Sequence, residues 1–98
     1  MTATLTPAEQ QEAERLLAGL HDRGYIDYEQ HKTLTAGARV RHRGQQYPEA
    51  YRDGTGNIVA VTARNERDVE LVVAYDKPRF EGMSRLTVLA DYHVEVIG

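Results

Sequence analysis

The chain lacks cysteine and tryptophan, and it contains a single phenylalanine among its 98 residues. Without cysteine there is no disulfide framework, no thiolate metal site and no thiol nucleophile, and a cytoplasmic location is the default expectation. The first residues carry neither the basic nor the apolar segment of a signal peptide. No apolar run approaches the roughly 20 residues needed to cross a bilayer, so no membrane partner is expected. The length suits one small globular protein.

The chain also has little excess charge of either sign. The formal net charge is −3, and residues 1–36 hold six acidic against three basic side chains, whereas residues 37–98 hold nine of each. A dedicated nucleic-acid-binding domain is usually basic overall. This balance argues against nucleic acid as the main partner, but it leaves room for a local basic patch.

The N-terminal residues carry the start signals of a helix. Thr6 is a suitable N-cap, Pro7 suits the first helical position, and Glu9 completes a capping box. Gly24 is expected to end the helix, because glycine readily adopts the left-handed conformation found just after a helix. One face of this helix is apolar, through residues spaced three and four apart: Ala13, Leu16, Leu17 and Leu20.

A second, shorter helix is predicted from Asp27 to about Leu34, because Asp27 can cap it and Gln30 follows three residues later. The two helices would form a hairpin arm over residues 1–36. This segment resembles the short helical-hairpin domain often found at the termini of bacterial proteins, through Leu16-Leu17, Leu20, Asp22, Gly24, Ile26 and Tyr28-Glu29. The arm would close one end of the domain that follows it, or serve self-association or partner docking.

From Arg39 onward the apolar residues alternate with polar ones, which is typical of strands. Loops are expected at Gly44–Asp53 and Asp76–Gly82, and a turn at Asn65–Asp68. A single helical turn is expected around Asp91. The pattern leaves no room for βαβ units and favours an all-β barrel. The five predicted strands are Arg39–Arg43, Ile58–Val61, Val69–Tyr75, Leu86–Leu89 and Val94–Ile97.

No residue pattern points to catalysis, a metal or a cofactor. The glycines of Gly54-Thr55-Gly56 lie between a loop and a strand, which is the wrong context for a phosphate-binding loop. The lone serine, Ser84, has no nucleophile motif around it. The histidines are spaced unlike metal ligands: His21, His31, His42 and His93. We therefore expect a protein that is not an enzyme and holds neither a cofactor nor a metal.

The strand region resembles the SH3-like superfamily of small β-barrels, and most of all the Tudor-like and KOW-like branches of bacterial transcription and repair proteins. The segments that carry this resemblance are Gly37-x-Arg39-Val40, Gly54-x-Gly56-x-Ile58-Val59, Val73-x-Tyr75-Asp76, Leu86-x-x-Leu89 and Ala90-Asp91-Tyr92-His93-Val94. The resemblance implies an α+β protein in which a helical hairpin precedes a five-stranded SH3-like β-barrel over residues 37–98. The tryptophan that floors the SH3 peptide groove is absent, so proline-rich ligands are not expected.

Aromatic residues are placed in segments that converge on one side of an SH3-like barrel. Such a surface suits a protein partner, because tyrosines combine apolar area with a hydroxyl for hydrogen bonding. Alternatively, some of these rings roof the small core. The predicted partner-binding surface is Tyr47, Tyr51, Phe80 and Tyr92, with Arg52 and Arg79 at its rim. By analogy with these relatives of similar fold, we expect the partner to be a component of the transcription or DNA-repair machinery.

Two alternative functions follow from other features. Arg39, Arg41 and Arg43 project from one strand face at a spacing of about 6–7 Å, close to that of phosphates along a nucleic-acid strand. The same row also fits a solvated face that protects an exposed strand from aggregation. In the third hypothesis, the helical hairpin drives oligomerisation of a structural or assembly subunit.

Overall fold

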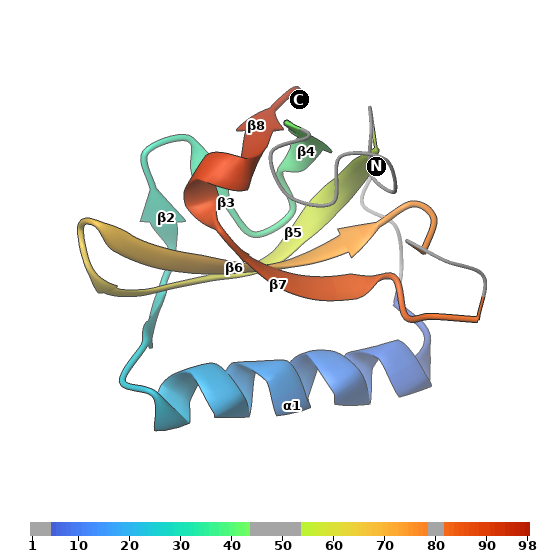
Figure 1. The fold of residues 1–98 in the computed structure, drawn as a ribbon, viewed down its shortest axis with the longest axis horizontal. Coiled ribbons are helices and arrows are strands. Elements are labelled where there is room, and N and C mark those ends of the chain that lie inside the picture. The colour runs from blue at the N-terminus through green and yellow to red at the C-terminus, as the bar shows by residue number, and fades with distance from the viewer. Residues whose placement is uncertain (1–4, 44–53, 79–81) are drawn as a thin grey trace.

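Residues 5–43, 54–78 and 82–98 are described by the computed structural model of the chain. Figure 1 shows the helix α1 (Pro7–Asp22) lying along one face of an antiparallel sheet. The α+β class with an N-terminal helix is therefore confirmed. The elements that follow α1 are β1 (Ile26–Tyr28), β2 (Gln30–His31), β3 (Leu34–Thr35), β4 (Arg39–His42), β5 (Thr55–Asn65), β6 (Asp68–Tyr75), β7 (Leu86–Ala90), the 3-10 helix η1 (Asp91–His93) and β8 (Val94–Val96).

Both ends of α1 follow the sequence prediction. The Thr6 hydroxyl accepts from the Glu9 amide at 3.1 Å, and the Glu9 carboxylate accepts from the Thr6 amide at 3.0 Å. At the other end Gly24 has φ +94°, and the Tyr25 amide donates to the Leu20 carbonyl at 3.0 Å. These bonds satisfy main-chain groups that a helix leaves open at its ends. No helix among the described residues is both long and apolar enough to cross a membrane.

The predicted second helix is wrong, because residues 26–35 form strands β1, β2 and β3. Asp27 does not cap a helix; its carboxylate is 2.8 Å from Nε2 of His21. Gln30 donates to the Lys32 carbonyl at 2.7 Å and so supports a hairpin turn. A helix this short is marginal by itself. Pairing of β1 with the second half of β5 provides main-chain bonds instead, and it overrides the local helix signals.

The sheet is built around the long strand β5. Its first half pairs with β4 and its second half with β1, while β6 runs along its other side. The strand order is β7-β6-β5-β4-β8, with β1 beside β5, so all five predicted strands are present and a sixth is added. A bulge at Val59 keeps Ile58 and Val61 on the same side of β5. Closure of this sheet into a barrel stays a prediction.

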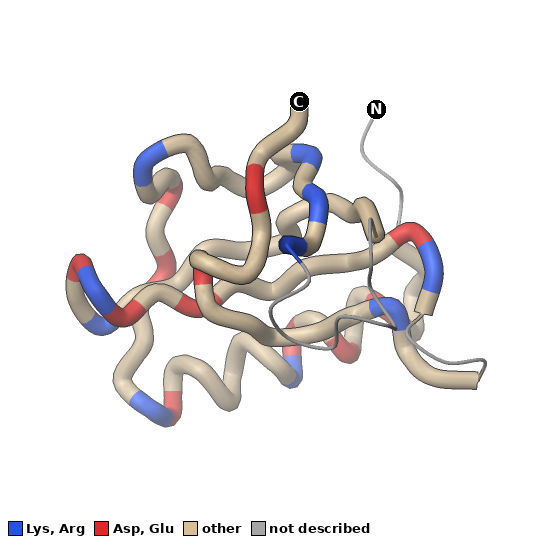
Figure 2. Tube along the Cα trace, turned by 45° about the horizontal axis from the view of Figure 1, so that its top comes forward, with Lys and Arg blue, Asp and Glu red and all other residues tan. Residues whose placement is uncertain are grey.

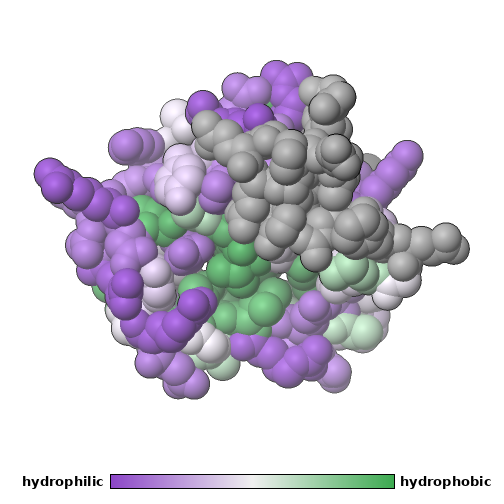
Figure 3. Space-filling model, viewed as in Figure 1, coloured by the Kyte–Doolittle hydropathy of each residue, from purple (hydrophilic) through white to green (hydrophobic). Residues whose placement is uncertain are grey.

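Strand β6 is buried on both faces and separates two apolar clusters. One cluster joins Leu71, Val73 and Tyr75 to side chains of β3, β4, β7 and β8. The other joins Val72 and Ala74 to α1. Figure 3 shows apolar side chains gathered on one face between β7 and α1. The predicted apolar face of α1 is thus confirmed as a packing surface against the sheet.

Candidate protein-binding groove

Of the six residues predicted to contact a partner, the structure describes only Tyr92. It lies in η1 and is 63% exposed, the highest exposure among the large hydrophobic residues described. The predicted surface therefore stays a prediction, and the structure shows only that Tyr92 is exposed. The others lie outside the described residues, as does the whole predicted loop over residues 44–53: Tyr47, Tyr51, Arg52, Arg79 and Phe80.

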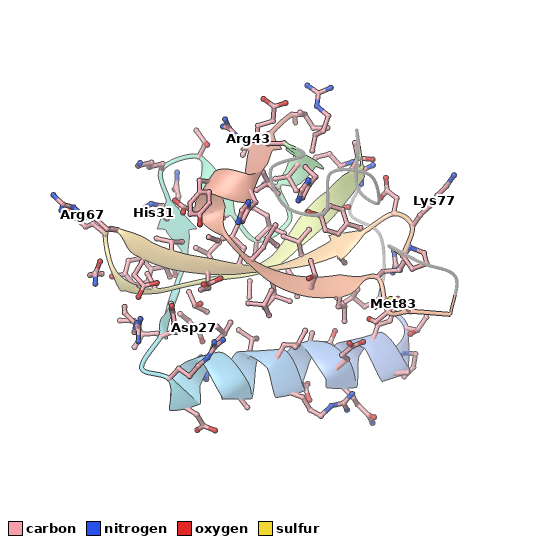
Figure 4. The ribbon with its side chains drawn as sticks, viewed as in Figure 1. Asp27, His31, Arg43, Arg67, Lys77 and Met83 are labelled. Carbon is pink, nitrogen blue, oxygen red and sulfur yellow. The ribbon has the colours of Figure 1, made fainter. Side chains whose placement is uncertain are left out.

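Tyr92 lines a groove of about 460 Å³ between the β2–β3 turn, η1 and β8. Arg43, which follows β4, also reaches it. Figure 4 shows His31 of β2 and Arg43 on the side of the sheet that faces away from α1. The groove is therefore formed by short elements that are far apart in sequence. Its lining residues are Lys32, Thr33, Leu34, Arg43, Asp91, Tyr92, Val94, Glu95 and Val96.

The groove has buried apolar residues beneath an exposed aromatic rim. Leu34 and Val94 are 6% and 3% exposed and belong to the sheet core. Val96 is 36% exposed and lies at the end of β8. Lys32 has φ +57°, a left-handed conformation that a lysine rarely adopts and that the two-residue β2–β3 turn imposes. This turn holds the lysine at the mouth of the groove.

The charges that line the groove are unequally paired. Glu95 accepts two hydrogen bonds from the Arg41 guanidinium, at 3.0 and 2.8 Å. Asp91 lies 3.7 Å from Nε2 of His31. Neither Lys32 nor Arg43 forms an ion pair with any described carboxylate. Elsewhere acidic and basic positions intermingle along the described chain, with no face of a single sign in the view of Figure 2.

Two histidines lie behind the groove. The parallel rings of His42 and His93 have centroids 6.3 Å apart, and Tyr92 contacts His93 with centroids 4.3 Å apart. Burial lowers the pKa of His42, and the neighbouring His93 lowers it further. Burial also lowers the pKa of His93, although the nearby Asp91 opposes this shift. Both shifts favour the neutral imidazole. Among the described residues, no three His, Cys, Asp or Glu side chains are grouped so that they could hold a metal ion.

Two members of the predicted arginine row, Arg39 and Arg41, lie on the face of β4 opposite the buried Val40 and His42, and each is paired with a carboxylate. Arg43 follows β4 and donates to the Val94 carbonyl at 3.2 Å. Arg39 forms a bidentate ion pair with the Asp76 carboxylate and also donates to the Asn57 side-chain oxygen at 2.9 Å. Arg41 is bound to Glu95. These carboxylates reduce the positive charge that the row can offer to phosphates. Contact with nucleic acid through Arg39, Arg41 and Arg43 stays a prediction that this pairing does not favour.

The sequence patterns point to Tyr92 but not to most of the groove. Lys32 and Leu34 fall within the segment predicted to be helical, and Arg43 is predicted as part of the arginine row. The one available signal is the Asp91-x-His93 spacing, which joins two groups near the groove. Comparison with family models, with curated proteins and with solved structures gave no match to this chain. Any functional assignment therefore rests on the groove itself.

Proposed function

We propose that this protein is a non-catalytic binding module that contacts a partner protein through the groove between the β2–β3 turn, η1 and β8. The observation that carries the proposal is the 63% exposed ring of Tyr92 beside the buried side chains of Leu34 and Val94. Exposed tyrosines over an apolar base are typical of the residues that dominate protein interfaces. Their hydroxyl groups accommodate polar main-chain atoms of a ligand at the same time.

The groove suits part of a polypeptide chain. It is open to solvent along one side, and one of its walls is strand β8. An extended segment can therefore lie along it and place a side chain against Tyr92. The resemblance to Tudor-like and KOW-like domains suggests bacterial transcription or repair proteins as the first partners to test.

The proposal is tested by selecting random peptides displayed on phage against the whole chain and against Tyr92→Ala. The wild type is expected to enrich a family of related sequences, and Tyr92→Ala is expected to bind them at least tenfold more weakly. Tyr28→Ala is the matched control, because Tyr28 is 38% exposed but lies in β1, outside the groove. It should bind the enriched peptides as the wild type does.

Equal binding by Tyr92→Ala and the wild type would refute this groove as the contact surface. Failure of the wild type to enrich any sequence family would contradict peptide binding itself. The thermal unfolding midpoint of each variant checks that the lost binding is not lost folding, and the exposure of Tyr92 predicts no change in that midpoint.

A further inference from the structure

Strand β8 is a terminal strand of the sheet on the side of the groove. Within the described residues it pairs with β4 alone. The Arg43 amide donates to the His93 carbonyl at 2.8 Å, and the Ile97 amide likewise donates to β4 at 2.8 Å. Main-chain groups alternate in direction along an antiparallel strand. Those of Val94 and Val96, which lie between these bonded positions, therefore point away from β4.

These outward groups border the groove, because Val94 and Val96 both line it. The Val94 carbonyl accepts from Nε of Arg43 at 3.2 Å. The Val96 amide donates to no described residue, and the Val96 carbonyl accepts from none. Open main-chain groups on an edge strand are a template for another strand, and many peptide-binding domains use such an edge.

The charges at this edge select the kind of strand that fits. The negative charge of Glu95 is neutralised by Arg41. The remaining charged residues of the groove lining are two cations, Lys32 and Arg43, and one carboxylate, Asp91. The net charge that a ligand meets is thus positive, although the whole chain carries −3. Complementary charge favours association and orients the ligand. A segment with carboxylate side chains satisfies this surface better than a neutral or basic segment.

From these contacts we infer that β8 binds an extended, acidic segment of a partner protein and adds it to the sheet as a further strand. The inference rests on the proposed function and specifies its ligand. Hydrogen bonds to the main chain of Val96 set the position of the segment. One apolar side chain packs against Leu34 and Tyr92, while flanking carboxylates face Lys32 and Arg43. Alternation of apolar and acidic residues is the expected ligand pattern, since neighbouring strand residues point to opposite faces.

Three capped peptides of five residues test the ligand chemistry. The first alternates glutamate with valine, the second replaces glutamate by lysine, and the third is the glutamate peptide N-methylated at alternate amides. The first is titrated into the isotope-labelled whole chain and followed by amide NMR. We expect shifts at Tyr92 and Val96 and slower hydrogen exchange of the Val96 amide. The lysine and N-methylated peptides should bind at least tenfold more weakly.

Variants of the chain test the same contacts from the protein side. Lys32→Gln and Arg43→Gln should each weaken the glutamate peptide two- to fivefold, with a loss that shrinks at high salt. Arg67→Gln is the matched control, since Arg67 is an exposed cation at the far end of the β5–β6 hairpin, as Figure 4 shows. It removes the same charge and should leave the affinity unchanged.

The main-chain bond is tested by Val96→Pro, which removes the amide that points into the groove. Proline is tolerated on an edge strand where its nitrogen faces outward. This variant should lose at least tenfold in affinity, whereas Val96→Thr keeps the amide and should lose much less. If Val96→Pro fails to fold, the N-methylated peptide still decides the question from the ligand side.

Equal binding of the glutamate and lysine peptides would refute the acidic ligand. Equal binding of the N-methylated peptide would refute strand addition. In either case, peptides that are enriched by selection and depend on Tyr92 would leave the proposed function intact. Sedimentation at increasing protein concentration adds a further test: a dimer that Val96→Pro dissociates would assign the β8 edge to a second copy of this chain and overturn the inference.

Discussion

The two sides of the sheet are closed in different ways. On one side, α1 is held near its N-terminus, because Glu9 accepts two hydrogen bonds from Arg85 at 2.7 and 2.9 Å and Glu12 accepts from Ser84 at 2.5 Å. On the other side, only short segments of the described chain cover the core, and they leave a groove between β2–β3, η1 and β8. A single continuous helix covers one face of the sheet, whereas the several short elements on the other face leave main-chain edges and gaps that a ligand can fill.

The difference separates stability from binding. The side chains that join α1 to the sheet are buried or paired, so their replacement should affect folding. The groove carries an exposed aromatic ring, two cations that pair with no described carboxylate, and an open strand edge, which contribute little to folding. We therefore expect changes on the helix side to alter the free energy of unfolding and changes on the groove side to alter ligand affinity.

The largest effect is expected from Leu20→Ala, which opens a cavity under α1. Leu20 is fully buried in the cluster that joins the helix to β6 and β7. Such a truncation costs about 2–5 kcal/mol, through lost burial and an unfilled cavity. Urea unfolding of the variant measures this loss. Leu17→Ala is the comparison, because Leu17 is only partly buried and should cost less. An unchanged midpoint for Leu20→Ala would contradict the packing of α1 on the sheet.

Gly56→Ala should disturb both sides at once. A Cβ at this position would lie 2.5 Å from the Ala74 carbonyl oxygen and 2.8 Å from the Tyr75 Cα, both main-chain atoms that cannot move aside alone. The strands β5 and β6 must separate locally, at a cost of about 1–3 kcal/mol. Unfolding by urea gives the stability, and hydrogen exchange should show the greatest loss of protection near the Gly56–Tyr75 pair. Wild-type stability in this variant would refute the close approach of the two strands.

The two sides should respond to acid in different pH ranges. The pKa values of His42 and His93 are lowered from 6.5 on folding, so the unfolded chain binds their protons more tightly. The contribution of these two histidines to the free energy of unfolding is fully present above about pH 6.5 and decreases as the pH falls below that value. Hydrogen bonds from Arg85 lower the pKa of Glu9 from its ordinary value of 4.5 to about 2. The helix side therefore loses stability only from about pH 4.5 down toward pH 2.

Urea unfolding at pH 7.5, 6.5 and 5.5 measures the contribution of the histidines. His42→Gln and His93→Gln should each reduce the dependence of stability on pH over this range, whatever their effect at pH 7.5. Glu9→Gln should leave that dependence unchanged and alter it only below pH 4.5. An unaltered pH dependence in both histidine variants would show that their protonation is not linked to folding.

The smallest effect is expected from Gly19→Ala on the outer face of α1. Apart from its chain neighbours and the adjacent helix backbone, no described atom lies within 4 Å of a Cβ built at this position. Alanine restricts the unfolded chain and favours the helix, so stability should rise by about 0.5–1 kcal/mol. The thermal unfolding midpoint provides the measurement, and peptide affinity at the groove should not change. A decrease in stability would indicate that this helix face is in contact with another part of the chain.

Local signals predicted the parts of the fold that depend on neighbouring residues. Thr6, Glu9 and Gly24 determine where α1 begins and ends, because capping bonds form within a few residues. The alternation from Val69 to Tyr75 identified the strand and the face that Val69, Leu71, Val73 and Tyr75 share. The turn before Asp68 was likewise predicted, and the Asn65–Asp68 pair closes it. Each of these features is decided by sequence separations of a few residues.

The segment over residues 26–35 shows where such reasoning fails. Asp27 and Gln30 are compatible with a short helix, and nothing nearby in sequence opposes it. The long strand β5 offers its second half as a pairing edge, and β1 joins it across more than thirty residues. This non-local pairing determines the local conformation, since a strand needs a partner that its own sequence does not contain.

The sequence by itself determined the N-terminal helix, the strands after Arg39 and the exposed tyrosine next to the last strand. Only the tertiary structure decided that the β2–β3 turn, Arg43 and β8 meet around that tyrosine. It also decided that Arg39 pairs with Asp76 and Arg41 with Glu95. The spacing of the two arginines in the sequence is also compatible with binding to phosphates. The physical reason is that helix caps and strand alternation are properties of short segments, whereas a groove and its net charge arise from segments that approach one another only on folding.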